Sequence, residues 1–177
     1  MGYAGGEKKN PTYRDLGDHT ETLEIDFDPQ VISYEDLLAV FWKGHDPTRA
    51  AWSRQYMSAV FFHDEDQKRM ALETRMRMAE KAGREIHTEI LPAETFYRAE
   101  DYHQKYRLRQ DRILMREFNR IYATAREFTD STAAARINGY LGGHRSRNRL
   151  EKEIDRLGLS PSGEERLRKQ VRRYTRQ

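Results

Sequence analysis

Side chains that could carry acid–base chemistry gather in four short polar segments of this sequence. They lie at His19–Glu21, His45–Pro47, Gln55–Tyr56 and Phe96–Tyr106. The chain contains no cysteine among its 177 residues, so thiol nucleophiles, thiolate metal sites and disulfides within it are excluded. Chemistry would therefore depend on histidine, tyrosine and carboxylate side chains. The segments fall at the ends of predicted elements, where functional residues often lie.

Each polar segment also has an ordinary structural explanation. Taken alone, Glu21 is best interpreted as a carboxylate that flanks a strand, and His45–Asp46 is typical of a turn after a helix. Buried tyrosines usually bond to the backbone through their hydroxyl groups. The six histidines show no metal-binding spacing such as HExxH, so we expect no metal site. No single residue identifies a reaction by itself.

Regular patterns predict the elements that position these segments in the first part of the chain. Residues 22–27 alternate between apolar and acidic side chains, which predicts a half-buried strand. Ser33 with Asp36 three residues later is a capping-box signature, so we expect a helix to begin there. Its apolar residues continue to Trp42, and Gly44 is expected to end it.

The next stretch predicts a strand, a helix and another strand. Residues 57–62 are almost wholly apolar, which predicts a strand buried on both faces. Asp64 is expected to cap a helix that runs to Gly83. Residues 86–91 alternate again, and Pro92 is expected to stop that strand. The inner side of the helix is predicted to carry Leu72, Met76 and Ala79.

The element order predicts the fold class. Strand, helix, strand, helix, strand indicates an α/β or α+β sheet with helices packed on it. From Asp111 onward apolar residues recur at helix spacing. Ser162 with Glu165 predicts the start of a last helix, so the chain should end in a helical hairpin. The apolar residues of this region are Leu114, Phe118, Ile121, Tyr122, Ala125, Leu150, Ile154, Leu157, Leu167, Val171 and Tyr174.

Charge and hydropathy limit the functional classes. Residues 144–177 carry 11 Lys and Arg against 5 Asp and Glu, so this tail is basic, whereas the net charge of the whole chain is +3. A basic tail can bind nucleic acid, but a solvated helical face is the interpretation we favour. No apolar run approaches the roughly 18 residues of a membrane span, and no signal peptide is evident. We therefore expect a cytoplasmic protein without membrane attachment.

Taken together, the segments resemble those of A-type peptide methionine sulfoxide reductases (MsrA). No one segment is decisive, but the ordered set across residues 2–106 is highly specific. The matching pieces, in family order, are Gly2–Gly6, Asn10–Tyr13, His19–Glu21, Asp28–Pro29, Ile32–Glu35, Val40–Trp42, His45–Pro47, Gln55–Tyr56, Ser58–Ala59, Phe96–Tyr97 and Ala99–Gln104, followed by Tyr106.

The resemblance implies a reaction and roles for four residues. In this family a cysteine thiolate attacks the sulfoxide sulfur of oxidised methionine, and a glutamate protonates the sulfoxide oxygen. Glu21 matches that acid, and Tyr13, Tyr56 and Tyr106 match the tyrosines that bind the oxygen. A carboxyl group in an apolar aromatic pocket can hold a proton near neutral pH, as a general acid must. No metal and no cofactor is implied, only an external thiol reductant such as thioredoxin.

Three departures from the family pattern stand out. The family's Gly-Cys-Phe-Trp-Gly segment lies upstream of the turn at which this sequence starts. Ala51 is the nearest position to the family's substrate-pocket aspartate, and the resolving cysteine near the C-terminus has no counterpart. A truncated product, a late start or a misread selenocysteine codon would each explain the missing nucleophile.

These departures shape the expected fold and domains. The resemblance implies a two-layer, ferredoxin-like α+β sandwich of the reductase type that lacks its first strand–helix–strand, about 25 residues at typical element lengths. We expect an incomplete reductase domain over residues 1–110. A helical C-terminal extension should follow over residues 111–177 and end in the basic hairpin.

The resemblance implies that the function is repair of oxidised methionine in proteins, that is, reduction of methionine-S-sulfoxide. We expect a monomer that is inactive alone because it lacks the nucleophile. Two alternatives stay open: a non-catalytic module that binds methionine sulfoxide in peptides, and a basic interaction module that acts through residues 144–177. The former predicts a stable fold and the latter predicts salt-sensitive binding to polyanions.

Overall fold

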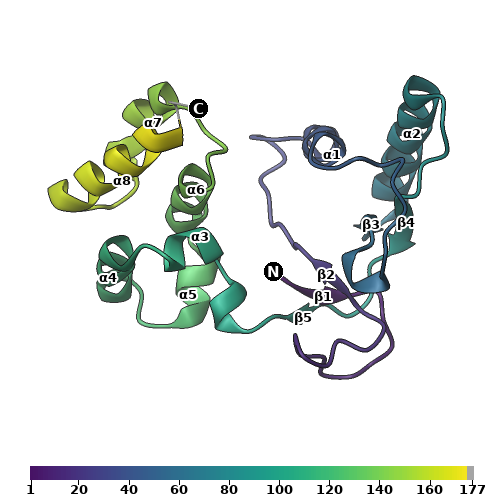
Figure 1. Ribbon diagram of the computed structural model, residues 1–177, viewed down its shortest axis with the longest axis horizontal. Coiled ribbons are helices and arrows are strands. Elements are labelled where there is room, and N and C mark those ends of the chain that lie inside the picture. The colour runs from purple at the N-terminus through teal and green to yellow at the C-terminus, as the bar shows by residue number, and fades with distance from the viewer. Residues whose placement is uncertain (175–177) are drawn as a thin grey trace. The chain divides into compact units, whose positions relative to one another are not determined.

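The computed structural model describes residues 1–174 and divides into two compact units. The first unit comprises Met1–Glu100 and the second begins at Asp101. Figure 1 shows the strands with helices α1 and α2 in the first unit, and helices only in the second. No helix among the described residues has the length and apolar character that a membrane span requires. The chain therefore has an α+β part followed by a helical part.

One sheet of the first unit is antiparallel and three-stranded. Its order is β2 (Thr20–Thr22), β1 (Gly2–Ala4) and β5 (Tyr97–Arg98), so β1 lies in the centre. All three residues of β1 are buried, and Tyr3 packs with Leu16 and Ala99 in a small core. Since β1 pairs Tyr3 with Glu21, the register brings the candidate acid to the sheet beside that core.

The other sheet of the first unit is a parallel pair. Strand β3 (Ala59–Phe62) runs to β4 (Glu89–Pro92) through helix α2 (Glu65–Ala82), because parallel strands need a crossover connection. Helix α1 (Tyr34–Lys43) packs against α2. The shared core is formed by Leu38, Trp42, Val60, Ala71 and Ile86.

Local side-chain chemistry accounts for the limits of both helices, as the sequence predicted. The backbone N–H of Asp36 donates to Oγ of Ser33 at 3.1 Å, and the N–H of Ser33 donates to Oδ2 of Asp36 at 3.2 Å, which completes a capping box. The Asp64 carboxylate accepts the N–H of Gln67 and caps α2. Gly83 ends α2 with φ of +60°, a left-handed conformation that favours glycine.

The buried face of α2 differs from the predicted one. Leu72 and Met76 are exposed, and Ala71 and Thr74 are buried in their place. Of the predicted inner residues only Ala79 packs against the core. Successive residues of an α-helix point about 100° apart around its axis. A buried face that includes residue 71 instead of residue 72 therefore leaves the longer side chains of Leu72 and Met76 exposed.

The strand predicted over residues 22–27 is wrong for most of its length. Strand β2 ends at Thr22, and residues 23–28 have no regular structure. Leu23 and Ile25 are 61% and 50% exposed. The physical reason is that β2 pairs on one edge only, with the three-residue strand β1, so nothing extends the ladder past Thr22.

The two strands of the parallel pair also differ in detail from the prediction. Only Val60 of β3 is buried, so β3 is not buried on both faces. Strand β4 begins at Glu89, and Pro92 is its last residue, not the residue after it. Ile86 nevertheless lies in the core, because it precedes the strand on a segment that packs under α1 and α2.

The second unit consists of six helices and two short 3₁₀ turns among the described residues. The turns are η2 (Asp101–His103) and η3 (Ile154–Arg156). The predicted apolar residues Leu114, Phe118 and Leu167 are fully buried in its core, whereas Ile121 is half exposed. The helices are α3 (Tyr106–Arg109), α4 (Arg112–Ile121), α5 (Ala125–Asp130), α6 (Thr132–Leu141), α7 (Arg147–Glu153) and α8 (Pro161–Tyr174).

The last helix begins two residues earlier than a cap at Ser162 predicts. Helix α8 starts at Pro161, and Oγ of Ser160 accepts the N–H of Gly163 at 3.2 Å. Proline suits the first helical position because its missing N–H would have no partner there. Ser162 is therefore inside the helix. The side chain of Tyr174, predicted on its apolar face, lies outside the described residues.

Candidate active site

Glu21 lies in a hydrogen-bonded cluster with two residues of a neighbouring turn. Gln55 and Tyr56 belong to the 3₁₀ turn η1 (Arg54–Tyr56), which packs against β2. Nε2 of Gln55 donates to Oε1 of Glu21 at 2.7 Å and to the Tyr56 hydroxyl at 3.1 Å. Both amide hydrogens are thereby used. Because Oε1 of Glu21 already accepts a hydrogen bond, a proton on this carboxyl group would sit on Oε2.

Tyr13 joins the same cluster from the loop before β2. Loss of hydration, a hydrogen bond with the Tyr13 hydroxyl and the negative charge of Glu21 together raise the pKa of Tyr56. The Tyr56 oxygen accepts from Gln55, so its own proton is directed toward another acceptor. The ring of Trp52 packs at a tilt of 33° against that of Tyr56, with centroids 5.0 Å apart. Both tyrosines keep part of their surface exposed, which a ligand would require.

Arg54 attaches the turn η1 to the loop that precedes β2. Its Nε donates to the carbonyl of Asp18 and its Nη2 to the carbonyl of Gly5, each at 2.7 Å. The hydroxyl of Thr20 donates to the Arg54 carbonyl at 2.9 Å. Three hydrogen bonds thus hold Gln55 against Glu21. The side chains of the cluster are placed by backbone contacts as well as by one another.

His19, which the sequence offered as a chemical group, stabilises a loop. Its ring is buried, with Nδ1 accepting the N–H of Gly6 at 3.2 Å. Nε2 lies 2.7 Å from the carbonyl of Lys8, which can only accept, so Nε2 carries the hydrogen. With both ring nitrogens occupied, His19 has no free group for catalysis.

His45 stabilises the end of α1 in the same manner. Nδ1 lies 2.9 Å from the Phe41 carbonyl and therefore carries the hydrogen. Nε2 is then free to accept the hydroxyl hydrogen of Thr88 at 3.0 Å. The interpretation of His45–Asp46 as a helix-end turn is confirmed.

Sequence reasoning gave no role to two residues of this region. One is Gln55, which links Glu21 to Tyr56. The other is Glu100, whose Oε2 accepts the Tyr3 hydroxyl at 2.6 Å and whose Oε1 accepts the backbone N–H of Tyr13 at 3.1 Å. Both belong to segments that matched the family pattern, and that membership was the only available signal.

Tyr106 and Ala51 complete the set of predicted positions. Tyr106 belongs to the second unit, where it begins α3 and is about half exposed. The residue before it, Lys105, has a left-handed backbone with φ of +52°. Ala51, at the position nearest the family's aspartate, is exposed and precedes η1. The structure therefore brings together Glu21, Tyr13 and Tyr56 within the first unit.

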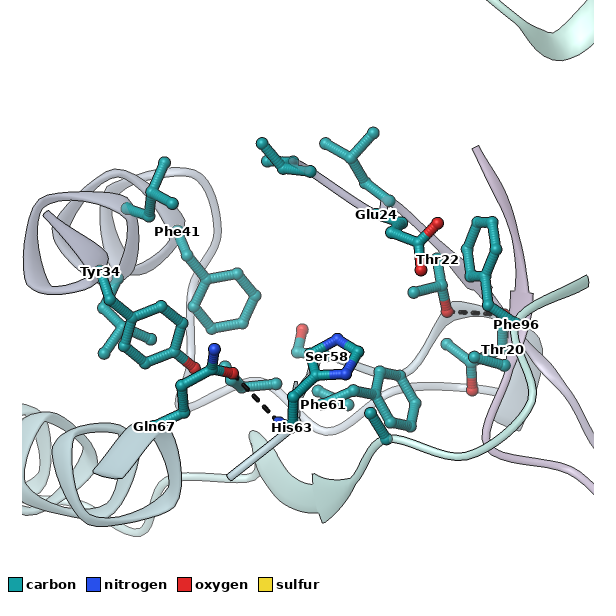
Figure 2. Close-up of a pocket in the computed structure, with 18 of the residues that line it drawn as sticks. Thr20, Thr22, Glu24, Tyr34, Phe41, Ser58, Phe61, His63, Gln67 and Phe96 are labelled. Atoms are coloured by element: carbon teal, nitrogen blue, oxygen red, sulfur yellow. Dashed lines mark hydrogen bonds between the residues drawn. The ribbon is translucent and has the colours of Figure 1, made fainter. Parts of the chain in front are cut away.

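An open cleft of about 910 Å³ adjoins this cluster (Figure 2). One wall is formed by residues 20–27 and Phe96, and the opposite wall by Tyr34 and Phe41 of α1. Phe61 of β3 lies between these walls. The hydroxyl of Tyr34 is buried and has no hydrogen-bond partner among the described residues. The cleft is mainly apolar, and Glu21 is among the residues that line it.

Comparison with known proteins identifies the family. The family model of peptide methionine sulfoxide reductase matches residues 1–137. The model of the helical domain of selenoprotein methionine sulfoxide reductase A matches residues 124–169. A peptide methionine sulfoxide reductase of Drosophila melanogaster is 42% identical over 164 residues, which cover 92% of this chain and 65% of the relative. The chain thus spans less than two thirds of that relative's length.

Two further comparisons agree. The enzyme MsrA of Methanothermobacter thermautotrophicus is 48% identical over 118 residues, 60% of this chain and 69% of the relative. The crystal structure of Mxr1 from Saccharomyces cerevisiae in reduced form is similar with a TM-score of 0.57 and 30% identity, covering 62% of this chain and 68% of that chain. This cysteine-free chain belongs to the A-type peptide methionine sulfoxide reductase family and carries that family's helical C-terminal domain.

Proposed function

We propose that this chain supplies the proton donor and the sulfoxide-binding side chains of a peptide-methionine (S)-S-oxide reductase site. The observation that carries the proposal is a cluster in which Gln55 links Glu21 to Tyr56 and the Tyr56 hydroxyl hydrogen-bonds with that of Tyr13. The substrate is methionine-S-sulfoxide within oxidised proteins, and the reaction is repair. The sulfoxide oxygen would accept hydrogen bonds from the two tyrosines beside the acid.

The chemistry requires a cysteine, and these residues contain none. A thiolate attacks the sulfoxide sulfur, and the oxygen takes a proton from Oε2 of Glu21. The oxygen then passes to the cysteine sulfur as a sulfenic acid, and the reduced methionine leaves. Two further thiols, from an external reductant such as thioredoxin, return the sulfenic acid to a thiol with release of water and formation of a disulfide.

The proposal extends to the fold of the first unit and to the domain boundary near residue 110. We interpret the first unit as a ferredoxin-like sandwich without its first strand–helix–strand, which agrees with the open edges of its two short sheets. The reductase domain of residues 1–110 would then overlap the second unit at α3, which packs against α6. Residues 111–177 would form the helical extension.

The first experiment measures turnover. Residues 1–177 alone, with a methionine-S-sulfoxide peptide and excess dithiothreitol, should give no turnover above a control without protein. The second form is this chain fused after a segment that carries the family's Gly-Cys-Phe-Trp-Gly, and it should reduce the peptide. Turnover by the cysteine-free chain would contradict the proposal.

Variants of the fused form test the roles of the cluster. Glu21→Gln should slow single-turnover reduction by about 10²–10⁴-fold, the usual contribution of a general acid. Tyr56→Phe should slow it less, about 2- to 10-fold, because one neutral hydrogen bond is worth roughly 0.5–1.5 kcal/mol. The matched control Glu24→Gln, on the same wall of the cleft, should leave the rate unchanged. A rate for Glu21→Gln within about threefold of wild type would refute the role of Glu21, since surface changes usually stay within ±0.5 kcal/mol.

The second candidate is a module that binds methionine sulfoxide without reducing it. This candidate is favoured because the hydrogen-bonded cluster of Glu21, Gln55 and Tyr56 is present although the chain contains no cysteine to act as nucleophile. It predicts that residues 1–177 bind a methionine sulfoxide peptide more tightly than the matching methionine peptide. Isothermal titration calorimetry measures this difference, and equal affinities would exclude the binding module.

The third candidate, a basic interaction module, is weakened by the ion pairs of the tail. Arg168 bonds to Glu151 at 2.9 Å and to Glu164 at 3.1 Å. Arg166 bonds to Asp111 at 2.8 Å. Much of the tail's positive charge therefore faces carboxylates of the same unit, and polyanions would have to compete with them.

A further inference from the structure

We propose that the second unit carries a binding site for a phosphate monoester group, formed by the side chains of Arg136, Arg145 and Arg149 around Glu153. Three observations on the described residues support this site: an excess of positive charge, unused guanidinium donors and a buried support beneath the arginines. The site lies wholly in the second unit, whereas Glu21 lies in the first. It therefore goes beyond the proposed function and does not depend on it.

Helical periodicity and one short loop bring the three arginines together. Arg136 precedes Tyr140 by about one turn of α6, and Arg149 precedes Glu153 by about one turn of α7. Side chains four positions apart lie on the same face of a helix, so both arginines lie beside the Tyr140–Glu153 hydrogen bond. Arg145 comes from the loop that joins the two helices. Three successive segments of the chain thus converge on one carboxylate.

Tyr140 and Glu153 form a buried support for the arginines. The guanidinium of Arg145 lies over the ring of Tyr140, 6.0 Å from its centroid, which is the range of a cation–π contact. The Glu153 side chain is 7% exposed, whereas the side chains of Arg136 and Arg145 are 39% and 40% exposed and that of Arg149 is 61% exposed. The arginines are therefore held from the inside and face solvent on the outside.

The charges of this group do not cancel. Among the described residues, Glu153 is the one carboxylate within 4 Å of the three guanidinium groups, so a net charge of +2 remains. Like charges held around a single carboxylate repel one another. A second anion, bound on the exposed side, would relieve this repulsion.

Most of the guanidinium hydrogens have no acceptor in the part of the chain that the structure describes. Nη1 of Arg145 donates to Oε1 of Glu153 at 3.4 Å, which is a long hydrogen bond. Nη1 of Arg136 and Nε of Arg149 lie 3.7 Å and 3.6 Å from Oε2 of Glu153, beyond hydrogen-bond distance. Each arginine has five N–H donors, and their fork matches two oxygens of a phosphate. The donors that such a ligand needs are therefore available.

A phosphate monoester fits these features better than a carboxylate or a polyanion does. At pH 7 it has a charge of about −1.5 to −2 and three acceptor oxygens, which suit a net charge of +2 and three guanidinium groups. A carboxylate has one charge and two oxygens. The neighbouring residues Arg147 and Arg168 both pair with Glu151, so the excess charge at the site does not continue through them as a basic stripe for a nucleic acid.

The test is isothermal titration calorimetry of the full chain at about pH 7.5 in a chloride buffer, with inorganic phosphate, AMP and cyclic AMP as ligands. AMP has a doubly charged monoester, whereas cyclic AMP presents the same nucleoside with a singly charged diester. AMP should bind to one site per chain and about tenfold more tightly than cyclic AMP, the value of one charge-assisted hydrogen bond. Tighter binding of AMP than of phosphate would indicate an organic monoester, and the reverse order or equal affinities would indicate inorganic phosphate. Each of these results supports the site.

Variants separate a binding site from a purely structural cluster. The double variant Arg136→Gln with Arg149→Gln leaves Arg145 to balance the carboxylate, so the chain should fold, and its affinity for AMP should fall by about a hundredfold, or tenfold for each arginine. Arg149→Lys keeps the charge without the fork and should weaken binding less than Arg149→Gln does. The matched control is Arg126→Gln, which removes an arginine of the same unit that also pairs with a carboxylate, that of Asp130 at 3.6 Å. It should leave the affinity for AMP unchanged.

The remaining outcomes would overturn the site. They are an absence of AMP binding, equal affinities for AMP and cyclic AMP, and an unchanged affinity for AMP in the double variant, each of which would leave the arginines as partners of Glu153 alone. Binding of a short single-stranded DNA more tightly than AMP, with a salt dependence that indicates four or more phosphate contacts, would assign the charge to an extended basic face instead. None of these measurements requires turnover, so a failure of reductase activity would contradict only the proposed function.

Discussion

Glu153 and Tyr140 form the centre of a charged cluster inside the helical unit. The carboxylate of Glu153 is 7% exposed and accepts the Tyr140 hydroxyl at 2.7 Å. Three guanidinium groups surround it, those of Arg136 at 3.7 Å, Arg145 at 3.4 Å and Arg149 at 3.6 Å. Burial and the hydrogen bond to Glu153 raise the pKa of Tyr140 to about 12, so the hydroxyl stays protonated as the donor.

We predict that Glu153→Gln and Tyr140→Phe each destabilise the chain and are not additive. Tyr140→Phe removes a hydrogen bond to a charged group, which costs about 1.5 kcal/mol at the lower end of the usual range because the arginines still compensate the carboxylate. Glu153→Gln leaves a weaker, neutral hydrogen bond and three unpaired but partly exposed arginines, for about 2 kcal/mol in total. The double variant should cost about 2.5 kcal/mol, since the same hydrogen bond is counted in both single changes.

Urea denaturation followed by circular dichroism at 222 nm, the usual helix signal, measures these free energies of unfolding. The matched control is Asp130→Asn, which removes an exposed partner of Arg126 and should change stability by no more than about 0.5 kcal/mol. If the losses of unfolding free energy in the two single variants sum to within about 0.3 kcal/mol of the loss in the double variant, the coupling is refuted. An effect of Glu153→Gln no larger than that of the control would refute the role of the carboxylate.

Three further predictions concern pH, glycine and a helix cap. Burial opposes ionisation of Glu153, but its hydrogen bond and the arginines hold the pKa of its carboxyl group below the ordinary value. The ionised carboxylate therefore adds to the free energy of unfolding above about pH 4.3, and this addition is lost as the pH falls. In urea titrations the wild-type chain, but not Glu153→Gln, should lose this stability between pH 7 and pH 3. Gly5→Ala should cost more than Gly83→Ala in thermal unfolding, because both positions have positive φ but only at Gly5 would the new Cβ lie 2.8 Å from the ring of Phe61. Equal costs would show that the ring moves freely. Ser33→Ala should cost about 1 kcal/mol of unfolding free energy through loss of the helix cap, and a change below 0.3 kcal/mol would contradict the capping box.

The elements that could be predicted from the sequence are those decided by neighbours along the chain. Helix α1 begins at Ser33 because its hydroxyl and the Asp36 carboxylate satisfy each other's backbone donors. Helix α2 runs from the Asp64 cap to Gly83 for the same local reasons. Caps act over three or four residues, so they can be recognised without knowledge of the fold.

The family could also be recognised from the sequence, because its segments occur in order. The roles within those segments could not. Gln55 carries no feature that announces a link from Glu21 to Tyr56, since that link depends on how η1 packs against β2. In the same way His19 looked chemically active until both of its ring nitrogens were found to bond the loop.

By itself the sequence determined the limits of α1 and α2, the absence of a thiol and, through its ordered segments, the family with its α+β class. The tertiary structure alone decided which predicted faces and edges are used. Residues 22–27 have the alternation of a strand, but a strand exists only where a second backbone accepts its hydrogen bonds, and β2 has such a partner only as far as Thr22. Leu72 and Met76 are apolar, yet they lie exposed because α2 packs through Ala71 and Thr74. Hydrogen bonding between strands and packing between helices join residues far apart in sequence, so no local pattern can specify them.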